Sequence, residues 1–221
     1  MSGIFTLERV TQPAIEVVTL AQMKTHLREF SSVTALDAEI TGLIQGAREW
    51  VEDFTGRVLV DSTWRLTVGE YANAYANVDS DTVSGYYRGP YYPRNDGGIL
   101  LRRSPVLAIT SFVSVAASTG VETTIDPATY ELREADSKWP GVYPLTGAIW
   151  TTGPLRITFR AGFADQTGSP QTGAEVVPVR FLQAMKLWVE AVYDRDEKLM
   201  PLLLEVAEKL IKSERADLSI A

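Results

Sequence analysis

The stretch Ala47-Arg-Glu-Trp-Val-Glu-Asp-Phe-Thr-Gly-Arg57 contains the point at which the chain changes from helical to strand periodicity. Before it, apolar residues recur at steps of three and four, which indicates a helix from about residue 36 to residue 55. Gly56 can take the left-handed conformation in which many helices end. After it, apolar and polar residues alternate across Arg57–Glu70, which predicts strands with one buried face. The fold therefore joins a helical part to a β part.

Three further helices are predicted on either side of the strand patterns. Thr19-Leu-Ala-Gln22 is a capping box ahead of a short helix over about 20–29. Val177-Pro178 opens a helix that continues to about residue 195, because proline is tolerated in a first turn. The last helix covers about 199–214. The order is therefore helix, helix, a block of strands, helix, helix.

We expect an α+β protein, since the strands follow one another without helices between them. Two N-terminal and two C-terminal helices, at about 19–56 and 177–214, would form a small helical core. An antiparallel β block at about 57–163 would be inserted into it, with a long loop at 71–98. Residues 1–221 would then form a single domain. Within the insertion, strand patterns cover about 99–102, 106–115, 130–132, 148–150 and 155–159.

The composition limits the classes of function. The chain has 221 residues, and 21 basic against 28 acidic side chains give a formal net charge of -7. Such a chain is repelled by phosphate backbones unless its basic residues gather on one face. It has no cysteine, which excludes disulfides and thiolate metal sites. Neither a signal peptide nor a membrane-spanning run is expected, which fits a cytoplasmic origin.

Residues for catalysis are not apparent in the sequence. The single histidine, His26, lies beside Lys24 and Arg28 and is more typical of a surface or packing residue than of a catalyst. The carboxylates of Glu49-Trp-Val-Glu-Asp53 are expected on a solvated helix face. No glycine pattern matches a phosphate-binding or dinucleotide loop. We therefore predict no catalytic residue, no metal ligand and no cofactor. A hydrolase with an unrecognised carboxylate pair stays open.

The segment Gly85-Tyr-Tyr-Arg-Gly-Pro-Tyr-Tyr-Pro-Arg-Asn-Asp-Gly-Gly98 combines tyrosines with arginines. Both residue types are enriched at protein interfaces. A binder of single-stranded nucleic acid also uses aromatics, but it needs a basic groove as well. A contact loop is favoured, because long ordered loops tend to be functional. A surface loop without a partner and a nucleic-acid site remain alternatives. The candidate contact residues are Tyr86, Tyr87, Arg88, Tyr91 and Tyr92.

Several loose motifs occur in a fixed order over most of residues 16–197. They are Val18-Thr-Leu-Ala-Gln-Met-Lys-Thr-His-Leu-Arg28, the opening stretch 47–57, Trp64-Arg-Leu66, Asp126-Pro-Ala-Thr-Tyr130, Ile157-Thr-Phe-Arg-Ala-Gly-Phe163, and Val177-Pro-Val-Arg-Phe-Leu-Gln-Ala-Met-Lys-Leu-Trp188 running on to Tyr193-Asp-Arg195. In this ordered set the chain resembles the head–tail connector (head-completion adaptor) family of long-tailed bacteriophages and gene transfer agents. The long segment 71–98 and the end of the chain, 199–221, depart from the family pattern.

The resemblance implies a structural protein of the virion and not an enzyme. Such proteins form a ring, expected to be twelve-membered, beneath the portal protein at the head–tail interface. The ring extends the DNA channel without binding DNA specifically, and it docks the stopper or tail-terminator protein. Assembly would take place in the cytoplasm of the host bacterium. No membrane partner is implied.

Two contacts follow as expectations from this role. The apolar stripe of the last helix either docks on the portal or packs on the chain's own core; its residues are Leu203, Val206, Leu210 and Ile211. The tyrosine loop would pack on a neighbouring subunit or on the next tail component. The alternative function is a tail or surface binding module that holds a ligand through residues 85–97.

Overall fold

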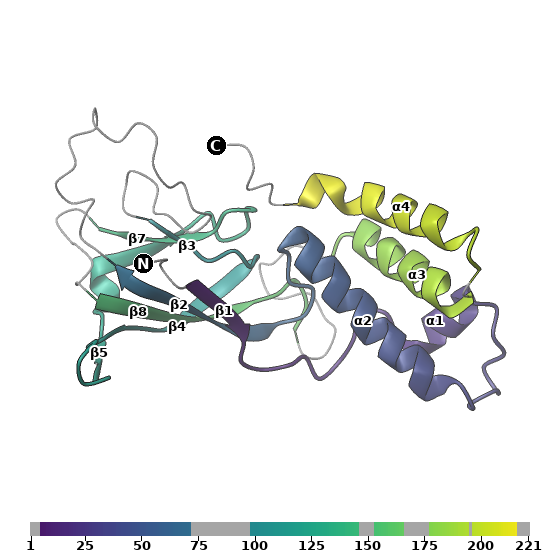
Figure 1. The fold of residues 1–221 in the computed structure, drawn as a ribbon, viewed down its shortest axis with the longest axis horizontal. Helices are drawn as coiled ribbons and strands as arrows, with labels where there is room; N and C mark the ends of the chain where they lie inside the picture. Colours follow the sequence, from purple (N-terminus) through teal and green to yellow (C-terminus); the bar gives the residue numbers. More distant parts are fainter. Residues whose placement is uncertain (1–4, 72–97, 146–152, 166–176, 195, 216–221) are drawn as a thin grey trace. The chain divides into compact units, whose positions relative to one another are not determined.

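The computed structural model describes residues 5–71, 98–145, 153–165, 177–194 and 196–215. The chain divides into two compact units (Figure 1). The helical unit comprises Pro13–Asp61 and Gly162–Asp217, and the sheet unit comprises Met1–Gln12, Ser62–Ala161 and Leu218–Ala221. The predicted α+β class is confirmed, since helices and antiparallel strands fall in separate parts of the sequence.

The helical unit contains four helices. They are α1 (Leu20–His26), α2 (Asp37–Thr55), α3 (Val179–Asp194) and α4 (Met200–Ile211), and the short 3-10 helix η3 (Lys212–Glu214) follows α4. Helix α3 packs against both α2 and α4, while α1 packs on α2 (Figure 1). The predicted capping box is present, because the Gln22 N–H donates to the Thr19 hydroxyl and the Thr19 N–H donates to the Gln22 side chain. Helix α2 ends at Gly56 with φ of 75°, as predicted.

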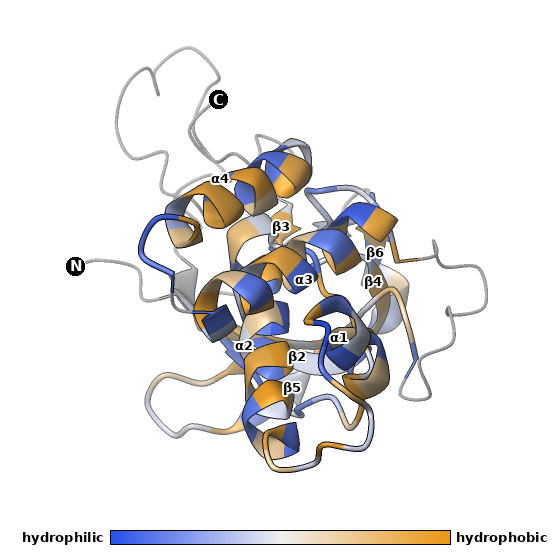
Figure 2. Ribbon diagram, turned by 90° about the vertical axis from the view of Figure 1, so that its right-hand side faces the viewer, coloured by the Kyte–Doolittle hydropathy of each residue, from blue (hydrophilic) through white to orange (hydrophobic). Residues whose placement is uncertain are grey.

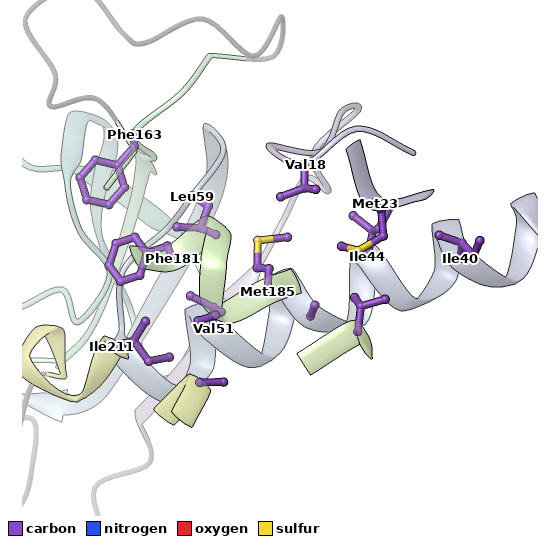
Figure 3. Packing of buried hydrophobic residues seen from close by; sticks show 14 residues of the cluster. Val18, Met23, Ile40, Ile44, Val51, Leu59, Phe163, Phe181, Met185 and Ile211 are labelled. Carbon is purple, nitrogen blue, oxygen red and sulfur yellow. The ribbon is translucent and has the colours of Figure 1, made fainter. Parts of the chain in front are cut away.

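A single apolar cluster holds these helices together (Figure 3). All four helices contribute to it, and Leu59 and Phe163 enter from the segments that leave α2 and precede α3. Phe163 and Phe181 lie with ring centroids 6.0 Å apart. Burial of each large side chain contributes about 1.5–3 kcal/mol relative to exposure. The cluster is Val18, Met23, Ile40, Ile44, Ala47, Val51, Leu59, Phe163, Phe181, Ala184, Met185, Val189, Ala207 and Ile211.

A buried group of charged side chains lies beside this cluster. The Arg48 guanidinium, 3% exposed, donates to Glu16 at 3.0 Å and to Glu52 at 2.9 Å. Glu52 also accepts the backbone N–H of Leu59 at 2.8 Å. The Arg48 guanidinium therefore links Glu16, in the segment before α1, to helix α2. Through Glu52 the same group also binds Leu59, in the segment that follows α2.

Two backbone segments run side by side where the chain leaves and re-enters the helical unit. The Phe163 N–H donates to the Val58 carbonyl and the Asp61 N–H donates to the Ala164 carbonyl, at 3.1 and 2.7 Å. Gly162 has φ of 155°, and a Cβ there would lie 2.3 Å from the Asp61 nitrogen. Only glycine permits so close an approach of two backbones.

The sheet unit contains two antiparallel sheets. The larger has the order β1 (Phe5–Arg9), β2 (Ser62–Tyr71), β8 (Gly153–Ala161), β4 (Val106–Val115) and β5 (Glu122–Thr124). The smaller has the order β3 (Ile99–Leu100), β7 (Gly141–Pro144) and β6 (Tyr130–Arg133), with the 3-10 helix η2 (Pro127–Thr129) before β6. Strands β2 and β8 are central, and they pair Trp64 with Phe159 and Leu66 with Ile157.

The larger sheet buries one face and leaves the other polar. On β2 and β8 the buried side chains alternate with threonines and arginines, as the period of two predicts. Arg65 pairs with Glu8 at 3.1 Å across β1 and β2, and Arg156 pairs with Glu122. On the buried face, Trp64 lies within 4.6 Å of the guanidinium of Arg9.

The structure corrects one predicted boundary. The strand expected from Arg57 begins at Ser62, because residues 57–61 belong to the helical unit. The strand expected at 148–150 lies outside the described residues.

Candidate interaction surfaces

Helix α4 carries the stripe that the sequence singled out for a partner. Ile211 is completely buried in the helical core, as is Ala207. Leu210 packs partly buried against the same core, and Leu203 is also half-buried. Val206, in contrast, is 48% exposed. The stripe is therefore divided: Ile211 and Leu210 pack on the core of their own unit, and Val206 is available to a partner.

An exposed apolar row begins just before α4 and continues along it. Leu199 and Leu202 are half or more exposed, and Met200 is also exposed. Leu199, Leu202 and Val206 follow one another at steps of three and four, so these three residues share one side of the helix. Figure 2 shows the hydrophobic colouring of the α4 ribbon at the edge of the helical unit. Beside the row, Lys209 pairs with Glu205 and lowers the pKa of that carboxyl.

Tyr86, Tyr87, Arg88, Tyr91 and Tyr92 lie outside the described residues, as does most of the predicted loop 71–98. The expectation that they contact a protein partner stays a prediction.

A second exposed apolar feature was missed by the sequence reasoning. The segment between α1 and α2, residues 27–36, is called the α1–α2 loop below. At its tip Phe30 is 76% exposed and Val33 is 40% exposed. The only sequence signal is an aromatic residue within the polar run Glu29-Phe-Ser-Ser-Val-Thr34. Helical and strand periodicity carry no information about such a loop.

Lys24 fixes the conformation of the α1–α2 loop. Its ammonium group is almost fully buried and donates to the carbonyls of Ser31 and Val33 and, at 2.7 Å, to the carboxylate of Asp37. A lysine is rarely buried unless its charge is compensated, and here three acceptors surround it. The loop is therefore held from inside the helical unit.

Helix α3 holds the start of the same loop. The Tyr193 hydroxyl donates to Glu29 at 2.8 Å. This hydrogen bond, together with burial and the negative charge of Glu29, raises the pKa of Tyr193 above its ordinary value. Next to Glu29, Arg28 has φ of 60°, a left-handed conformation that non-glycine residues adopt infrequently. Arg28 is exposed beside Phe30.

The described residues contain little that suggests chemistry. His26 lies 2.9 Å from a carboxylate oxygen of Glu190, between α1 and α3. Among the described residues no group of three or more His, Asp or Glu side chains could hold a metal ion. None of the described helices is both long and apolar enough to cross a bilayer. The described surfaces that stand out are therefore apolar ones, on α4 and on the α1–α2 loop.

Comparisons with known proteins identify a common fold. No protein-family model matches the sequence, and no curated protein is detectably similar to it. Several solved chains are similar in fold, and three of them match over 96% of this chain. They are the neck of an empty gene transfer agent (GTA) particle computed with C6 symmetry (TM-score 0.68, 23% identity, 96% of that chain), the virion of a native GTA particle (0.68, 23%, 95%) and the neck of a native GTA particle computed with C12 symmetry (0.64, 21%, 96%).

The similarity spans both units of the chain, since almost the whole length is covered in both directions. The fold expected from the resemblance to head–tail connectors is thereby confirmed. At 21–23% identity the likeness concerns the fold. The chain has the fold of chains found in the necks of gene transfer agent particles.

Proposed function

We propose that this protein is a structural adaptor in the neck of a phage or gene transfer agent particle. Copies of the chain form a ring, expected to be twelve-membered, beneath the portal protein. The ring extends the DNA channel and offers a docking surface to the stopper or tail-terminator protein. The chain acts in the virion after assembly in the host bacterial cytoplasm, and it carries out no enzymatic reaction.

One observation carries the proposal: the fold matches a chain from the GTA neck over 96% of both chains with a TM-score of 0.68. A fold alone does not specify a function. The two exposed apolar features give this chain surfaces suited to an assembly, because a ring needs contacts on two different parts of each subunit. A net charge of -7 per copy also favours passage of DNA over retention of it.

Imaging of the full chain mixed with the portal protein from its own genome tests the proposal directly. We expect a symmetric ring of additional density beneath the portal. Portals without added density, beside free chains under conditions that support assembly, would contradict it. That result would favour a tail or surface binding module instead.

The portal contact is assigned to α4. Among the four residues predicted from the sequence, Val206 is exposed, Leu203 and Leu210 are half-buried, and Ile211 belongs to the core. The proposed contact is therefore centred on Val206, with the two leucines at its margin. Replacement of Val206 by a charged residue places an unpaired charge in this contact and leaves the helical core intact.

We expect Val206→Asp to abolish binding to the portal while the circular dichroism spectrum is unchanged. Val121, which is 60% exposed in the sheet unit, supplies the matched control Val121→Asp. Portal binding that survives Val206→Asp would remove α4 from the contact. Binding that is lost equally with both variants would indicate an effect of charge in general.

The tyrosine loop is assigned to a neighbouring subunit or to the next tail component, through Tyr86, Tyr87, Arg88, Tyr91 and Tyr92. The assignment rests on residue type, since tyrosine and arginine are enriched at interface hot spots. Deletion of residues 85–97 should leave a folded chain that fails in ring formation or tail attachment. Normal rings with normally attached tails would show that the loop is dispensable.

A further inference from the structure

The α1–α2 loop has the properties of a preorganised contact. Surface loops usually keep conformational freedom that must be lost on binding. Here Lys24 donates to Ser31, Val33 and Asp37, and Tyr193 donates to Glu29, so the loop is ordered before any partner arrives. Burial of a lysine ammonium costs free energy that its acceptors must offset. The fixed conformation of the loop therefore indicates a role in binding.

What the loop presents to solvent is an anchor for a partner. Phe30 is 76% exposed and Val33, three residues later, is 40% exposed, so neither side chain belongs to the core. Arg28 adds an exposed cation in an unusual backbone conformation. Phenylalanine is a large apolar anchor and arginine is enriched at hot spots, which indicates an apolar acceptor with a carboxylate beside it.

The chain itself carries such an acceptor at the corner between α3 and α4. There Leu199 and Leu202 are exposed, the latter at 57%, and Glu197, two residues before Leu199, is exposed as well. Phe30, Leu199 and Leu202 are all solvent-exposed, so they do not cover one another within one copy. A neighbouring copy can cover them.

We propose that the α1–α2 loop of each copy docks on the α3–α4 corner of the next copy, with Phe30 against Leu199 and Leu202 and Arg28 beside Glu197. The contact is heterologous, so its repetition generates a ring when the rotation closes. This inference rests on the proposed function and names the contact that closes its ring. It leaves Val206, farther along α4, to the portal.

Site-directed cross-linking tests the contact, because the natural chain has no cysteine. The full-length double variant Phe30→Cys, Leu202→Cys is assembled on the portal and treated with a short bismaleimide. We expect a ladder of covalent multimers on a denaturing gel. Each single variant should give monomer, because a heterologous contact never sets residue 30 of one copy against residue 30 of another.

The outcomes separate this inference from the proposed function. A ring seen by imaging without a ladder would overturn the inference and leave the adaptor function standing. A covalent dimer from Phe30→Cys alone would also overturn it, because the loop would then meet its own copy. Absence of any ring on the portal would overturn the proposed function and, with it, this contact.

A charge exchange gives a second readout without cysteine. We expect Arg28→Glu to weaken ring formation and Glu197→Lys, added to it, to restore assembly. Glu208→Lys, an exposed change elsewhere on α4, should not restore it. Phe30→Ala should weaken association about thirtyfold, the loss typical of a hot-spot residue. Full assembly with Phe30→Ala, or equal rescue by both lysine variants, would refute the pairing.

Discussion

The helical unit contains a buried arginine–glutamate ion pair, whereas the sheet unit contains an exposed one. In the helical unit Arg48 is 3% exposed and Glu52 is completely buried, and both lie beside the apolar cluster. In the sheet unit Arg156 and Glu122 pair on the open face, where both remain exposed by a third or more. The same chemical pair therefore occupies two dielectric environments, and its effect on stability should differ accordingly.

The largest effect is expected from breaking the buried pair. Glu52→Ala leaves the Arg48 charge without its buried partner and also leaves the Leu59 N–H without its acceptor. We expect a loss of about 3–5 kcal/mol in the free energy of unfolding, measured by urea denaturation. Glu49 is the matched control, since its carboxylate lies 3.6 Å from the same guanidinium but is exposed. Glu49→Ala should cost less than about 1 kcal/mol. Equal losses would abolish the distinction between the two environments.

The helices were predictable from the sequence because their signals are local. The Thr19 capping box, Gly56 after α2 and the proline near the start of α4 all lie within a few residues of the helix ends that they define. Strands β1 and β5 were missed for the opposite reason. Phe5–Arg9 is paired with residues 64–68, far away in the sequence, and Glu122–Thr124 is exposed throughout and has no alternation to detect.

The candidate surfaces likewise depend on residues far away in the sequence. Periodicity placed the apolar residues of α4 on one stripe, but it could not tell that Ile211 packs on the core while Val206 faces solvent. That difference depends on where α2 and α3 lie. The α1–α2 loop was missed altogether, because its order comes from Lys24 and Tyr193, which lie outside the loop.

The next largest effect concerns Lys24, another buried cation of the helical unit. Lys24→Met keeps the length of the side chain and removes the ammonium that binds Ser31, Val33 and Asp37. We expect a loss of about 1–2 kcal/mol in global stability, because the freed carbonyls lie in an exposed loop and can bind water. Hydrogen exchange at residues 28–34 should rise well beyond that at α3. Unchanged exchange in the loop would show that Lys24 does not order it.

A smaller effect should depend on pH. Burial raises the pKa of Glu16 above its ordinary value, although Arg48 acts to lower it, and the charges of Glu52 and Glu49 add to the rise. The folded state therefore binds the Glu16 proton more tightly than the unfolded state does. This contribution to stability is present in full below the unfolded pKa and is lost as the pH rises through the folded one. Relative to Glu16→Gln, the natural chain should lose free energy of unfolding as the pH rises from the unfolded to the folded pKa of Glu16. A difference in free energy of unfolding between the two chains that is constant with pH would exclude the effect.

The smallest effect is expected on the open face of the sheet. Arg156→Ala removes an exposed ion pair with Glu122, which solvent screens, and should change the free energy of unfolding by at most about 1 kcal/mol. A double-mutant cycle with Glu122→Ala isolates the pair from the packing of the arginine stem, which lies between strands β2 and β4. The coupling energy should fall further in about 1 M salt, where the Debye length is about 3 Å. The coupling of Arg48 with Glu52 should keep most of its value in the same salt, because water and ions do not reach it. A salt-insensitive coupling of Arg156 with Glu122 would mean that this face is covered, and the sheet unit would then hold a buried charge pair as the helical unit does.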